Sequence, residues 1–155
     1  MELIPLLLLA PLLVFVAFFD MRLMRIPNWI SLAGLAIFVL TMPLLPGSEI
    51  VARLMMAAIV FVLGIGAFMM RWFGGGDIKI LSVLFLFIPS GTLSLYGLGF
   101  SASMLAGIAL ILTLRTIPWP ANTEWVSLRE TGTFPMGISI ALSGIIHPYV
   151  VQAFG

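Results

Sequence analysis

The sequence predicts an all-α polytopic membrane protein, folded as one bundle of about six transmembrane helices. Hydrophobic residues make up 62% of the 155 residues and charged residues only 8%, whereas about 25% of the residues of a soluble domain are charged. Apolar runs close to the length that crosses a bilayer recur along the chain, and most charges lie in the short segments between them. We therefore expect residues 1–155 to form a single transmembrane domain.

Six apolar segments are the expected helices. A spanning helix needs about 20 apolar residues, and the runs that approach this length are residues 3–19, 29–45, 51–70, 80–96, 100–114 and 134–151. The fourth and fifth are short, and Pro89-Ser90-Gly91 predicts a kink in the fourth, because proline removes a backbone donor. The longest polar segment, 115–133, is expected to lie at the membrane surface.

The basic residues predict the orientation of the bundle. Six of the seven fall in the first, third and fifth loops, and only Arg53 falls on the opposite side. Because basic residues accumulate in cytoplasmic loops, we expect these three loops in the cytoplasm and both chain termini outside. The protein would then lie in the cytoplasmic (inner) membrane. We expect Arg53 to extend outward toward Glu49 and the membrane surface.

Composition also excludes several function classes. The chain has no cysteine, which excludes disulfides, thiolate metal ligands and thiol nucleophiles. Its net charge of +1, without a long basic run, argues against a nucleic-acid partner. The single histidine, His147, has no partners at metal-ligand spacing. We expect neither a metal nor a cofactor.

Asp20 and Asp77 are the only aspartates, and both lie where an apolar segment meets a polar loop. Carboxylates are costly beside a bilayer, so such residues are candidates for function. Two helices separate them, so both should lie on the same side of the membrane. Two neighbouring carboxyl groups share a proton; one can activate a water while the other polarises a carbonyl group. Alternatively, each aspartate pairs with an arginine or caps a helix.

The residues beside each aspartate extend this candidate site. Gly74, Gly75 and Gly76 allow close backbone approach and loop movement, although a plain turn is the simpler interpretation. Lys79 would either lower the pKa of Asp77 or extend to the membrane surface. Pro27 and Asn28 are expected to form the turn and cap that start the next helix.

Together these motifs resemble the type IV prepilin peptidase family, which includes the preflagellin peptidases and the small enzymes of tight-adherence (Flp) pilus systems. The first family motif is matched by Asp20, Arg22, Arg25, Ile26, Pro27 and Asn28. The second, Gly-x-Gly-Asp-x-Lys, is matched by Gly74, Gly76, Asp77 and Lys79. Phe134-Pro135-Met136-Gly137 is similar to the entry of the family's last helix.

The resemblance implies an aspartic endopeptidase with Asp20 and Asp77 as catalytic residues. Its substrates would be prepilins or pseudopilins, from which it removes a short basic leader after a glycine, at the cytoplasmic face. Besides these substrates, membrane lipid is the expected partner. Larger relatives carry paired Cys-x-x-Cys motifs and methylate the new terminus; because this chain has no cysteine, we expect no methyl transfer.

Two other functions fit parts of the sequence. A small proton- or ion-coupled transporter could use Asp20 and Asp77 as ion-binding carboxylates. Against it, neither acid is expected in the middle of a helix, where a transporter binds its ions. The chain could also be a non-catalytic subunit of a pilus assembly, in which case replacing either aspartate would not change cleavage of a prepilin.

Overall fold

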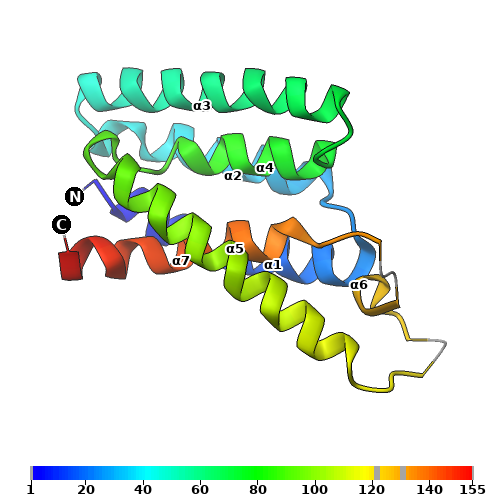
Figure 1. Cartoon of the computed structure of the whole chain (residues 1–155). Helices are drawn as coiled ribbons and strands as arrows, with labels where there is room; N and C mark the ends of the chain where they lie inside the picture. Colours follow the sequence, from blue (N-terminus) through cyan, green and yellow to red (C-terminus); the bar gives the residue numbers. More distant parts are fainter. Residues whose placement is uncertain (1, 121–122, 130–131, 155) are drawn as a thin grey trace.

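The computed structural model describes residues 2–120, 123–129 and 132–154, and in this part of the chain all regular structure is helical (Figure 1). The all-α prediction is confirmed. The elements are α1 (Ile4–Leu23), α2 (Asn28–Thr41), η1 (Met42–Leu44), α3 (Gly47–Met69), α4 (Gly75–Phe85), η2 (Ser90–Thr92), α5 (Leu93–Arg115), α6 (Val126–Arg129) and α7 (Met136–Phe154), where η marks a short 3₁₀ helix.

Four helical stretches of the described residues are long and apolar enough to cross a membrane: Ile4–Leu23, Gly47–Met69, Ser90–Arg115 and Met136–Phe154. The stretch Asn28–Leu44 is apolar but shorter. Successive long elements run in alternating directions, and both termini lie at the same end of the bundle (Figure 1). The start of α1 therefore lies at one end of the bundle, and its last turn lies at the other.

Helix α7 is the most enclosed of the long helices, and it packs against α1, α5 and α4. Small residues allow this close packing: a Cβ on Gly144 would lie 2.6 Å from Leu13 of α1 and 3.0 Å from Leu84 of α4. Helix α3, in contrast, packs mainly on α4 and exposes most of its length. The bundle thus consists of α1, α5, α6 and α7 on one side and α2, α3 and α4 on the other.

The fourth and fifth predicted segments differ from the structure. Helix α4 begins at Gly75 and ends at Phe85, and α5 begins at Leu93, so the predicted loop 97–99 lies inside a helix. The chain breaks before Pro89, which has no N–H to continue a helix and disfavours a helical conformation in the residue before it. The break that was predicted as a kink therefore separates two helices, and α4 is short.

Candidate active site

Asp20 lies in the last turn of α1 and is 5% exposed. Its Oδ2 accepts a hydrogen bond of 2.6 Å from the backbone N–H of Gly137, the second residue of α7. The free N–H groups at the start of a helix favour a negative charge. A Cβ at Gly137 would lie 2.8 Å from both Cβ and Oδ2 of Asp20, so only glycine fits there without movement. The start of α7 therefore fixes the carboxyl group of Asp20.

Asp77 lies in the first turn of α4, outside the four membrane-spanning stretches. The residue is partly buried, and this burial raises the pKa of its carboxyl group to about 6, although a backbone hydrogen bond at Gly74 opposes the shift. A Cβ on Gly74 would lie 2.9 Å from Oδ2 of Asp77. The glycine before the helix thus leaves room for this carboxyl group.

Both aspartates line one cavity of about 1400 Å³. Its walls come from the ends of α1 and α3, the starts of α4 and α7, the middle of α5, and α6. Apolar side chains such as Phe68, Met104 and Phe134 form much of the lining, and Arg25, Arg71 and Arg129 contribute positive charge. The cavity combines two acids with an apolar surface at the end of the bundle where the basic loops lie.

The triple glycine contributes space rather than an unusual backbone conformation. Among the described residues, no glycine has a positive φ. Gly75 and Gly76 are the first residues of α4, and a Cβ on Gly76 would lie 3.3 Å from Cβ of Ile26. The segment that follows α1 therefore packs directly against the start of the helix that carries Asp77.

Lys79, Pro27 and Asn28 are not among the residues that line this cavity. Lys79 Nζ donates a hydrogen bond of 3.1 Å to Oδ1 of Asn28, and both residues line a second groove of about 600 Å³ between α2, α3 and α4. Asn28 was expected to cap α2, but Pro27 takes the cap position, and Asn28 is the first helical residue. Lys79 thus bonds to Asn28, and Asp77 and Lys79 do not face each other, because they are two positions apart on a helix.

The sequence did not predict two features of the structure: the role of Gly137 and the burial of Arg53. Gly137 is a direct partner of Asp20, and its only signal in the sequence was the short match at Phe134-Pro135-Met136-Gly137. For Arg53, the expected pairing with Glu49 is confirmed, but the expected position at the membrane surface is wrong, because the side chain is 1% exposed within the bundle. Within the described ranges, no group of three His, Cys, Asp or Glu side chains could hold a metal ion.

The fold and this cavity define the class: an α-helical membrane protein with two carboxyl groups at one end of its bundle. The chain belongs to the type IV leader peptidase family, whose sequence pattern matches residues 7–114. The matched range includes both aspartates and ends before α7. Family membership indicates a peptidase. No curated protein and no solved structure matches the chain.

Proposed function

We propose that the protein is an aspartic endopeptidase that removes the short basic leader from type IV prepilin-like proteins. Asp20 and Asp77 are its catalytic residues, and cleavage follows a glycine at the cytoplasmic face of the inner membrane. Support comes from one observation above all: the only two aspartates of the chain, 57 positions apart, line the same cavity.

The proposed chemistry needs one carboxyl group ionised and the other protonated. The ionised group takes a proton from the attacking water, and the protonated group donates a hydrogen bond to the carbonyl oxygen of the scissile peptide. Two carboxyl groups close together favour this state, because the second proton is lost less readily than the first. The glycines at 74 and 137 leave room beside both acids.

The mixed lining of the cavity supports a substrate that has both polar and apolar residues near the cleaved bond. The polar part of this lining and the neighbouring basic loops support a scissile bond near the membrane surface, and Phe68, Met104 and Phe134 would offer contacts to apolar residues of the substrate. By the positive-inside rule, this end of the bundle faces the cytoplasm. We propose no methyl transfer, since the chain contains no Cys-x-x-Cys pair.

The test is cleavage of a co-expressed prepilin by single variants. Asp20→Asn and Asp77→Asn should each stop leader removal while the protein still inserts into the membrane. Glu124→Gln is the matched control, because Glu124 is an exposed acid that pairs with Arg22 outside the cavity. Normal trimming by either aspartate variant would contradict the proposal. Lost ion flux with unchanged processing would favour a transporter.

A further inference from the structure

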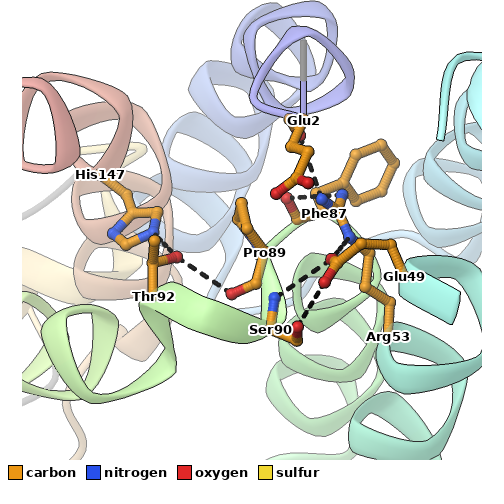
Figure 2. A network of polar contacts seen from close by, with 8 residues as sticks. All are labelled: Glu2, Glu49, Arg53, Phe87, Pro89, Ser90, Thr92 and His147. Carbon is orange, nitrogen blue, oxygen red and sulfur yellow. Dashed lines mark hydrogen bonds and ion pairs between the residues drawn. The ribbon is translucent and has the colours of Figure 1, made fainter. Parts of the chain in front are cut away.

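A second polar cluster, drawn in Figure 2, lies at the opposite end of α3 from the cavity that the two aspartates line. Its centre is Arg53, which lies near the start of α3, whereas Phe68 and Met69 at the end of α3 line the cavity with the acids. A fully buried arginine in a membrane-spanning helix is costly unless it is paired. Its contacts therefore indicate what it does.

The guanidinium group of Arg53 bonds to three segments. Nε donates to Oε2 of Glu49 at 3.1 Å, within α3. Nη1 donates to the backbone carbonyl of Phe87 at 3.3 Å, just after α4, and Nη2 donates to the backbone carbonyl of Glu2 at 3.1 Å, just before α1. One side chain thus contacts the far ends of the two helices that carry Asp20 and Asp77 (Figure 2).

Glu49 holds the next part of the same segment. Its Oε2 accepts a hydrogen bond of 3.2 Å from the backbone N–H of Ser90, and its Oε1 accepts one from the hydroxyl group of Ser90. The segment that joins α4 to η2 is therefore attached to α3 at Phe87 and at Ser90, the first residue of η2. Backbone groups at a helix break within a membrane need such partners, because lipid offers none.

We propose that Arg53 and Glu49 are positioning residues for the aspartate pair. They fix the end of α4 against α3 and against the chain before α1, and α4 is a short helix with Asp77 in its first turn. Displacement of the far end of α4 would thus shift or rotate Asp77 relative to Asp20, whose carboxyl group is also bonded to the start of α7. The effect on cleavage rests on the proposed function, but the effect on geometry does not.

The geometric part can be measured without any peptidase activity. The chain has no cysteine, and an ideal Cβ at Gly76 lies 3.3 Å from Cβ of Ile26, close to the separation in a disulfide. The double variant Ile26→Cys, Gly76→Cys therefore reports the position of α4 beside Asp77. We expect this pair to form a disulfide rapidly in membranes, and several-fold more slowly when Arg53→Met or Glu49→Gln is added.

The variants Arg53→Met and Glu49→Gln, made without the cysteines, should cleave prepilin about tenfold or more slowly. The loss should fall mainly on kcat, because a small displacement of reacting groups lowers the rate of the chemical step. Thr92→Val is the matched control: Thr92 lies in the same segment, but it bonds to Pro89 and to His147 of α7 and not to α3. It should leave both disulfide formation and cleavage close to those of the unsubstituted protein.

Unchanged disulfide formation in Arg53→Met and Glu49→Gln would overturn the proposal, as would an equal slowing in Thr92→Val. If Arg53→Met fails to insert, Glu49→Gln decides, because it changes the charge but keeps the size of the side chain. Slower disulfide formation with an inactive parent enzyme would reject the proposed function and leave the positioning role supported.

Discussion

The contact between Gly137 and Asp20 offers a sharp test of the site. In Gly137→Ala, the new methyl group would start 2.8 Å from Cβ and Oδ2 of Asp20 and 3.0 Å from its Cγ. Ordinary contacts of a Cβ begin near 3.4 Å, so the carboxyl group or α7 must move by about 0.6 Å. Misplacement of a reacting group by about 1 Å can cost about 10²-fold in rate.

We therefore expect Gly137→Ala to lower kcat/KM for leader removal by about 10- to 100-fold. The assay is cleavage of purified prepilin in detergent or vesicles, normalised to folded enzyme. Because overpacking also destabilises proteins by about 1–3 kcal/mol, thermal unfolding must be measured on the same samples.

Two glycines of the same chain serve as controls. Gly144→Ala is equally crowded on the same helix, but its new methyl group would meet Leu13 and Leu84 rather than an acid. It should lower stability with little change in rate per folded molecule. Gly66→Ala meets nothing within 4 Å and should change neither property adversely. A Gly137→Ala enzyme as fast as Gly144→Ala would refute the reasoning.

Three further predictions follow from single residues. Burial raises the pKa of Asp77 from 3.8 to about 6, so the folded protein binds more protons than the unfolded chain in this range; its Tm in detergent should fall as pH rises from about 4 to about 6, and less so in Asp77→Asn. An equal dependence of Tm on pH in both proteins would contradict a raised pKa of Asp77. Met24 ends α1 with a φ of 51°, so Met24→Gly should raise the free energy of unfolding by about 1 kcal/mol; a loss of stability on chemical denaturation would disagree. Gly76→Val should impair cleavage because Ile26 lies against it, whereas Gly47→Val, also at a helix start but with nothing within 4 Å, should not; similar activities of the two variants would contradict the close packing.

That the two aspartates lie at the same end of the bundle could be predicted, because it depends only on the number of helices between them. Asp20 and Asp77 follow and precede apolar segments that are separated by two crossings, so any antiparallel bundle brings them to one end. Apolar length and charge placement are encoded locally, and they were sufficient for the fold class and for this pairing.

The missed features depend on contacts between distant residues. The end of α4 could not be located from the sequence, because residues 80–96 form one apolar run. The backbone groups of Phe87 and Ser90 that are free at this break bond to Arg53 and Glu49, which lie more than 30 positions earlier. Hydropathy likewise places Arg53 at the surface, whereas three partners inside the bundle allow its burial. The role of Gly137 follows from a contact across 117 positions, which no local pattern contains.

The most direct test of the account is a double-variant cycle on the aspartates. If Asp20 and Asp77 act together on one water, each single Asp→Asn change should reduce leader cleavage on the order of 10⁴-fold, and the double variant should lose little more. Two losses that multiply in the double variant, or a single variant that cleaves at the unsubstituted rate, would show that the two carboxyl groups do not form one catalytic unit.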